Sequence, residues 1–140
     1  MARVTVDLPA SFHFATEIPI QVGHINYGGH LGNDSVLSLV HEARMRLFAH
    51  HGWTELDAGG AGIIMTDAAI VYRAEATWGM TLRAEVAVTE VGSRGCEIVT
   101  RLSDAAGGRE IARVKTGIVF FDYAARRIVS TPDAFRAAFA

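Results

Sequence analysis

One histidine lies where a glycine-rich loop is expected to meet the beginning of a helix. The loop, residues 25–33, has the sequence INYGGHLGN and contains His30. An imidazole here could take a proton from water near neutral pH or hold a carbonyl oxygen. The first amides of the following helix, including those of Gly32 and Asn33, suit a developing negative charge. Asn26 could orient the water or bind the same oxygen, although a simple joining turn is the structural alternative for the whole loop.

A carboxylate base, if the chemistry uses one, has to come from outside this loop. Glu75 follows the end of an expected strand, while His41 and Glu42 lie eight and nine residues after Asn33 in the expected helix. Asp34 could cap that helix or remain solvated. Each of these side chains alone has a structural alternative, and Glu75 and His41 are the preferred candidates.

Other classes of function find little support in the sequence. His24 and His30 lie six residues apart in a loop, so they lack the ligand spacing of a metal site. Cys96 is rejected as a nucleophile because no base lies near it in the sequence. A net charge of −2 over 140 residues offers no electrostatic case for nucleic acid. No apolar run of about 18 residues predicts a membrane span. The single cysteine indicates a reducing compartment, so we expect a cytoplasmic protein without a metal or redox cofactor.

The rest of the chain predicts one strand, one long helix and a series of antiparallel strands. Residues 12–22 alternate loosely and predict a strand, which Pro19 assigns to an edge or a bulge. Residues 33–51 repeat apolar side chains at spacings of four, three and four, which predicts a helix buried on several sides. Period-two patterns predict strands over 63–72, 81–91, 96–102 and 110–121, and residues 133–139 favour a short terminal helix.

This order of elements predicts an α+β fold in which an antiparallel sheet wraps around a central helix. The broad apolar face of the helix needs contacts on several sides, and a curled sheet provides them. No linker interrupts the chain, so we expect a single domain over residues 1–140. One edge or face of the sheet would stay exposed to solvent in a monomer, so we expect the protein to pair with another copy of the same chain.

The segment GHLGNDSVLSLVHEAR, residues 29–44, resembles the signature of the acyl-CoA thioesterases of the 4-hydroxybenzoyl-CoA type. It keeps the family's Gly-His pair at Gly29 and His30 and its Ala-Arg pair at Ala43 and Arg44. Later strands are also similar to the family, so the likeness covers nearly the whole chain. The resemblance implies the hotdog fold and the hydrolysis of an acyl thioester to a carboxylic acid and coenzyme A.

Five positions depart from the family's pattern: His24 stands at the first family aspartate, Val36 replaces a tyrosine, and the other three bear on the chemistry. Asn26 stands where the family often has its catalytic aspartate, and an amide can neither take a proton from water nor form an acyl ester. Gly32 replaces an asparagine of the family, and His41 replaces a glutamate that faces the site in some relatives. The resemblance therefore implies His30 as the working side chain, with the carbonyl oxygen held by the amides of Gly32 and Asn33.

The resemblance also bears on the charged residues. Glu75 stands where some acyl thioesterases place an acid. The phosphates of coenzyme A could be bound by Arg73, Arg113 and Lys115, because the paired N–H groups of a guanidinium match phosphate oxygens. The alternative for each of the three is a charged side chain that only faces solvent. We expect Arg44 to form an ion pair on the helix surface or between subunits.

Two further functions stay open beside the leading prediction of a dimeric or tetrameric acyl-CoA thioesterase. A hotdog dehydratase or hydratase would need a histidine and an acid at another spacing, commonly with a Pro–Gly turn that this sequence lacks. A non-catalytic protein that binds acyl-CoA or an acyl carrier is favoured by the missing aspartate. The sequence leaves open both the acyl group and the choice between coenzyme A and a carrier protein.

Overall fold

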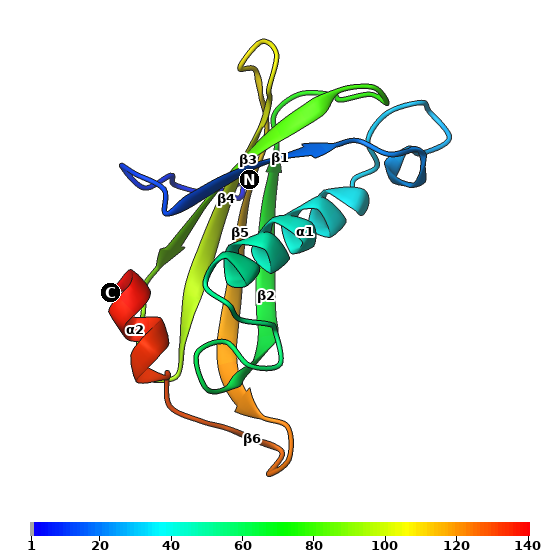
Figure 1. Ribbon diagram of the computed structural model, residues 1–140. Helices are drawn as coiled ribbons and strands as arrows, with labels where there is room; N and C mark the ends of the chain where they lie inside the picture. The colour runs from blue at the N-terminus through cyan, green and yellow to red at the C-terminus, as the bar shows by residue number, and fades with distance from the viewer. Residues whose placement is uncertain (1) are drawn as a thin grey trace.

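The computed structural model describes residues 2–140 and has a long helix lying across one face of an antiparallel sheet (Figure 1). The strands are β1 (Phe14–Pro19), β2 (Gly62–Tyr72), β3 (Thr81–Thr89), β4 (Gly95–Asp104), β5 (Glu110–Asp122) and β6 (Arg127–Ile128). They follow the order β1-β3-β4-β5-β2, with β6 paired to β5. The helices are α1 (Ser35–His50) and α2 (Asp133–Phe139), and a short 3-10 turn, η1 (Val22–His24), precedes α1. The expected α+β fold is confirmed.

Helix α1 is the centre of the hydrophobic core. Its residues Val36, Val40, Ala43 and Leu47 recur at helical spacing and are all 2% exposed or less. They pack against the inner face of the sheet in one continuous apolar cluster. Fully burying a valine or leucine side chain contributes about 1.5–3 kcal/mol, so Val36, Val40 and Leu47 fix α1 against the sheet. The helix ends before Gly52, whose φ of +75° is a conformation that glycine adopts without strain.

The boundaries at the beginning of the chain differ from those predicted. Strand β1 covers Phe14–Pro19 rather than residues 12–22, with Pro19 as its last residue on an edge of the sheet, where the missing N–H is tolerated. Helix α1 begins at Ser35, two residues later than predicted. Asp34 stands at the N-cap position but its side chain makes no capping hydrogen bond.

The residues before β1 form an extended segment that the sequence patterns did not reveal. Among residues 2–13 only Val6 is buried, and Nη1 of Arg113 donates to its carbonyl oxygen at 3.3 Å. Arg113 follows the inward-facing Ala112 on β5, so alternation places it on the face of the sheet opposite α1. The segment therefore crosses the outer face of the sheet and is anchored there through Val6.

Within residues 2–140, neither helix has the length and apolar character needed to cross a lipid bilayer.

Candidate active site

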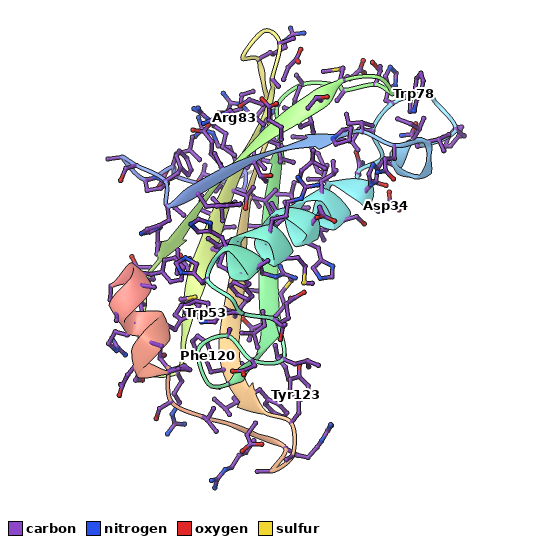
Figure 2. The ribbon with its side chains drawn as sticks, in the orientation of Figure 1. Asp34, Trp53, Trp78, Arg83, Phe120 and Tyr123 are labelled. Carbon is purple, nitrogen blue, oxygen red and sulfur yellow. The ribbon has the colours of Figure 1, made fainter. Side chains whose placement is uncertain are left out.

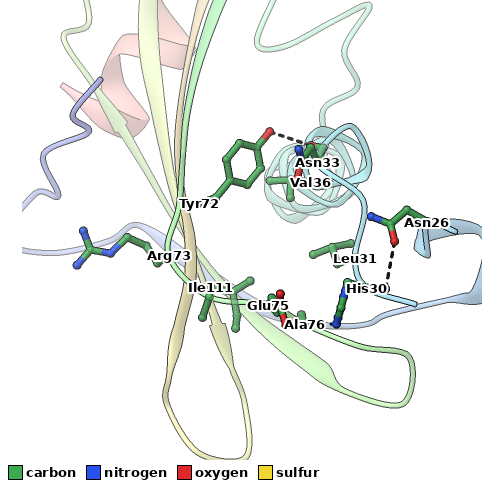
Figure 3. A pocket seen from close by; sticks show the side chains of 11 residues that line it. Asn26, His30, Leu31, Asn33, Val36, Tyr72, Arg73, Glu75, Ala76 and Ile111 are labelled. Atoms are coloured by element: carbon green, nitrogen blue, oxygen red, sulfur yellow. Dashed lines mark hydrogen bonds and ion pairs between the residues drawn. The ribbon is translucent and has the colours of Figure 1, made fainter. Parts of the chain in front are cut away.

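A cleft of about 360 Å³ opens where the amino end of α1 meets the end of β2 (Figure 3). Four parts of the chain build it: the loop before α1, the first turn of α1, the end of β2 with the segment that follows it, and Ile111 at the beginning of β5. Its lining residues are Asn26, His30, Leu31, Asn33, Val36, Tyr72, Arg73, Ala74, Glu75, Ala76 and Ile111. Four of the residues that the sequence nominated, Asn26, His30, Asn33 and Glu75, thus line one cavity.

His30 and Glu75 face one another inside this cleft. Nε2 of His30 lies 3.2 Å from Oε2 of Glu75, and their side chains are 43% and 77% exposed. The two residues come from separate segments of the chain. A backbone hydrogen bond links these segments at the next residues along, where the Leu31 amide donates to the Ala76 carbonyl at 2.8 Å. This backbone bond sets the register of the two segments and so places the carboxylate against the imidazole.

The side chain of Asn26 closes a turn and also leaves a donor free. Its Oδ1 accepts the backbone N–H groups of Gly28 at 2.9 Å and of His30 at 3.2 Å. Because two N–H donors define the oxygen, the amide nitrogen is the end that remains for a ligand. Figure 3 shows that nitrogen on the side of α1. The turn-forming role and the ligand-binding role that the sequence offered for Asn26 are therefore compatible.

The amides before α1 are less available than the sequence predicted. The Leu31 amide is bonded to Ala76, and the Gly32 amide donates to the His24 carbonyl at 2.9 Å, so neither is free to bind an oxyanion. The Gly32 amide thus serves the fold, and a Cβ at this position would require only that the exposed Asp34 side chain, with Oδ1 at 2.7 Å, turn away. In the described part of the chain, the Asn33 amide has no such acceptor and remains available at the positive end of α1.

Tyr72 is a site residue that sequence reasoning missed. Its hydroxyl donates to the Asn33 carbonyl at 3.1 Å, which fixes the peptide next to the available amide. The alternating pattern of β2 explained Tyr72 as a strand residue and so concealed it. The signal that could have found it is its register, because Tyr72 pairs with the inward-facing Ala112 at the end of the strand, where the sheet meets the loop.

His41 lies outside the cleft, so the expectation that it joins this site is not met within one chain. Its Nε2 lies 2.5 Å from Oε1 of Glu55, whose Oε2 accepts from Nε of Arg44 at 3.0 Å. The expectation of a surface position for Arg44 is wrong, since its side chain is only 5% exposed. Arg44 follows Val36 and Val40 at intervals of four and therefore lies on the buried stripe of α1.

The three cations proposed for phosphate binding do not converge on the cleft. Arg73 lines it, but its guanidinium points to the side of the sheet away from α1 (Figure 3), and its Nε lies 3.4 Å from Oε1 of Glu110. Arg113 and Lys115 lie on the outer face, because they alternate with inward-facing residues of β5. Lys115 is held between two carboxylates at 3.5 and 3.6 Å, which makes it a poor partner for an anion.

Cys96 is unsuited to nucleophilic chemistry. It is buried in the core on β4, and this burial, with a smaller contribution from Glu97, raises the pKa of its thiol to about 12. The reactive form of cysteine is the thiolate, which is scarce near neutral pH at such a pKa. The rejection of Cys96 on sequence grounds thus has a structural basis.

The fold is that of a known class of proteins. The sequence model of the family described as "Thioesterase-like superfamily" matches residues 20–139, so the chain belongs to this family. A comparison with curated proteins finds no match.

Solved structures of similar fold include proteins that are named as thioesterases. The 1,4-dihydroxy-2-naphthoyl-CoA thioesterase Slr0204 from Synechocystis is 19% identical, with a TM-score of 0.80 over 89% of this chain and 93% of its own. The PA2801 protein from Pseudomonas aeruginosa is 21% identical, with a TM-score of 0.83 over 93% of this chain and 100% of its own. The gentisyl-coenzyme A thioesterase BH1999 is 16% identical, with a TM-score of 0.79 over 91% of this chain and 100% of its own. At these identities the likeness establishes the hotdog fold.

Proposed function

We propose that this protein is an acyl-CoA thioesterase that hydrolyses an acyl thioester to a carboxylic acid and a thiol. The observation that carries the proposal is the pairing of His30 Nε2 with Glu75 Oε2 at 3.2 Å, in a cleft at the amino end of α1. Two of the structures of the same fold are named as CoA thioesterases, which supports this substrate class. The acyl group would lie against the apolar lining residues Leu31, Val36 and Ile111.

The His30–Glu75 pair is the proposed site of water activation. Glu75 is the one carboxylate that lines the cleft among residues 2–140, and it takes the role that an aspartate at position 26 would otherwise have. His30 holds this carboxylate toward the cleft. As the water oxygen attacks the thioester carbonyl carbon, its proton passes to Glu75.

The developing negative charge on the carbonyl oxygen would be stabilised on the α1 side of the cleft. The Asn33 amide and the side-chain nitrogen of Asn26 are the two available donors there, and the positive end of α1 adds its field. Collapse of the tetrahedral intermediate breaks the C–S bond. Glu75 then returns the proton to the departing thiolate, which leaves as the thiol, so no cofactor takes part.

The proposal is tested by measuring thiol release from a panel of acyl-CoAs by the wild type and by the variants His30→Ala and Glu75→Gln. Loss of the group that moves the proton lowers kcat by about 100-fold or more, and we expect this for Glu75→Gln. His30→Ala should also lower kcat, because Glu75 then loses the side chain that holds it toward the cleft. His50→Gln is the matched control, because His50 lies at the opposite end of α1 and outside the cleft.

Three results would contradict the proposal. Unchanged kcat in both variants would remove the assigned pair from the reaction. Wild-type protein that binds an acyl-CoA without cleaving it would be the non-catalytic binder, and one that adds or removes water at the acyl chain would be the hydratase or dehydratase.

We also propose that the protein forms a homo-oligomer through the free edge of β2. This strand is last in the sheet order and pairs on one side only, with β5. Its central residues, Met65 to Ala68, are exposed, and an exposed edge of this kind is normally paired or covered. Light scattering on the purified protein is expected to give at least the mass of a dimer, and a monomer mass at micromolar concentration would contradict this.

A further inference from the structure

A second groove lies on the outer face of the sheet and adjoins the cleft at the end of β2. It has a volume of about 610 Å³ and lies between the amino-terminal segment, residues 3–7, and the residues Val71, Tyr72, Arg73 and Arg113 of the sheet. Tyr72 and Arg73 line both cavities. A ligand that enters the cleft from this side therefore passes over the end of β2 with its remainder in the groove.

Positive charge gathers in this groove from three separate parts of the chain. Arg3 comes from the amino-terminal segment, Arg73 from the residue after β2, and Arg113 from β5, against Asp7 as the one carboxylate in the lining. Glu110 lies between two of the arginines, with Oε1 at 3.4 Å from Nε of Arg73 and 2.7 Å from Nε of Arg113. The arginines thus exceed the carboxylates even when Glu110 is counted.

From this juxtaposition we propose that the groove binds the phosphate groups of coenzyme A while the thioester occupies the cleft, an inference that rests on the thioesterase function proposed above. Guanidinium groups present paired N–H donors that match phosphate oxygens. The side chain of Arg73 is 51% exposed, so it can turn toward a ligand, whereas Arg113 is held by Glu110 and by the Val6 carbonyl. The carrier that this assigns is coenzyme A itself rather than a carrier protein.

The other outer-face grooves lack one of the two features that this groove combines. The groove that contains Lys115 includes the carboxylates of Asp7, Glu90 and Glu97, so its lining carries a net negative charge. A small groove at Arg94 and Arg127 is cationic, but it shares no lining residue with the cleft. Of these three grooves, the one beside residues 3–7 combines excess positive charge with continuity with the cleft.

The test compares three substrates that carry the same acyl group: acyl-CoA, acyl-dephospho-CoA and acyl-pantetheine. For the wild type we expect KM to rise in that order as phosphates are removed. For the double variant Arg3→Ala/Arg73→Ala we expect KM for acyl-CoA to rise about 10-fold or more, because two charge-assisted contacts are lost. Its KM for acyl-pantetheine and its kcat should stay within about twofold of the wild type, because the guanidinium of Arg73 points away from α1 (Figure 3) and the proposed catalytic pair of His30 and Glu75 is retained.

A second variant should change KM for acyl-CoA in the opposite direction. Glu110→Gln removes the carboxylate that competes with phosphate for Arg73 and Arg113, so KM for acyl-CoA should fall, while KM for acyl-pantetheine should not change. The matched control is Arg83→Ala, an exposed arginine on β3 that lies outside the groove (Figure 2), and it should leave all three KM values unchanged. A structural role of these residues alone would not produce opposite shifts confined to the phosphorylated substrates.

The failure of this inference and the failure of the proposed function are distinguishable. Equal KM values for acyl-CoA and acyl-pantetheine in an active wild type would overturn the groove assignment and leave the thioesterase intact; a preference for an acylated carrier protein would do the same. If no thioester is cleaved, the groove assignment is tested by calorimetry, which measures the binding of free coenzyme A to the wild type and to the double variant. Weaker binding in the double variant supports the groove, and equal or absent binding overturns it.

Discussion

The carboxyl end of α1 is closed by aromatic side chains, whereas its amino end borders the open cleft. At the closed end, Phe48, Phe120 and Phe135 are fully buried, and Trp53 stacks on Phe135 with ring centroids 5.6 Å apart. Figure 2 shows Trp53 and Phe120 of this group. At the open end, the polar side chains of Asn26, His30 and Tyr72 stay partly exposed, and each is held by only one or two polar contacts. The comparison indicates that apolar packing at one end of the helix keeps the other end in place for chemistry, so substitutions at the two ends should affect different quantities.

The largest effect on stability is expected from Phe135→Ala, which removes a ring in contact with Phe48, Trp53 and Phe120. Truncation of a buried phenylalanine leaves a cavity and lowers the free energy of unfolding by about 3–5 kcal/mol. Urea denaturation followed by circular dichroism measures this change. The kcat per folded molecule should remain that of the wild type, and a large loss of kcat in the folded fraction would show that the two ends are not separate.

Asn26→Asp tests the open end and restores the carboxylate that is usual in the family. The new carboxylate can still accept the amides of Gly28 and His30, but it lacks the N–H donor that Asn26 offers to the cleft. Removing one donor to an oxyanion lowers kcat by roughly 100-fold, and we expect this loss with little change in stability. A higher kcat in the variant would show instead that a carboxylate at this position acts as the base.

Tyr72→Phe should have a smaller effect at the same end. It deletes the hydrogen bond from the tyrosine hydroxyl to the Asn33 carbonyl, and a hydrogen bond of this kind contributes about 1 kcal/mol. Freed from this contact, the Asn33 peptide would hold its N–H less firmly, so kcat should fall several-fold. Steady-state kinetics beside a thermal melt separates this loss from any change in folding, and an unaltered kcat would exclude Tyr72 from positioning the site.

The smallest effect concerns His51, at the closed end. Partial burial, together with the nearby His50 and His13, lowers the pKa of His51 below its ordinary value of 6.5. The neutral imidazole is therefore favoured in the folded state, and its contribution to stability is present above pH 6.5 and is lost as the pH falls through the lowered pKa. Between pH 7 and about pH 5, the stability of His51→Gln should decline less than that of the wild type. Coincident pH profiles from urea denaturation would contradict this.

The sequence predicted the elements of this fold well because they are set by local patterns. The apolar repeat of residues 33–51 and the alternation of residues 63–72 each require a single buried face, and each became a helix or a strand close to its predicted bounds. The extended segment before β1 has no such pattern, since Val6 is its only buried residue among residues 2–13. Its path depends on a contact with Arg113, more than 100 residues away, which no local signal contains.

The candidate site was only partly predictable, for the same reason. His30, Asn26 and Asn33 lie in one short loop, so their proximity follows from the sequence. The pairing of His30 with Glu75 depends on how the segment after β2 returns to the loop, and the sequence nominated Glu75 without showing which partner it has. The occupied amide of Gly32 depends on a contact with His24 that only the folded loop reveals. The expectations of a single domain and of a cytoplasmic location stay predictions.

The anchoring of the amino-terminal segment through Val6 has a practical consequence for enzymology. A purification tag fused ahead of Arg3 would change the length and charge of the segment that lines the outer groove. If the groove binds the phosphates of coenzyme A as proposed, protein tagged in that way would differ from protein tagged after Ala140, above all in KM for acyl-CoA. Assays intended to rank such substrates should therefore begin with a native amino terminus.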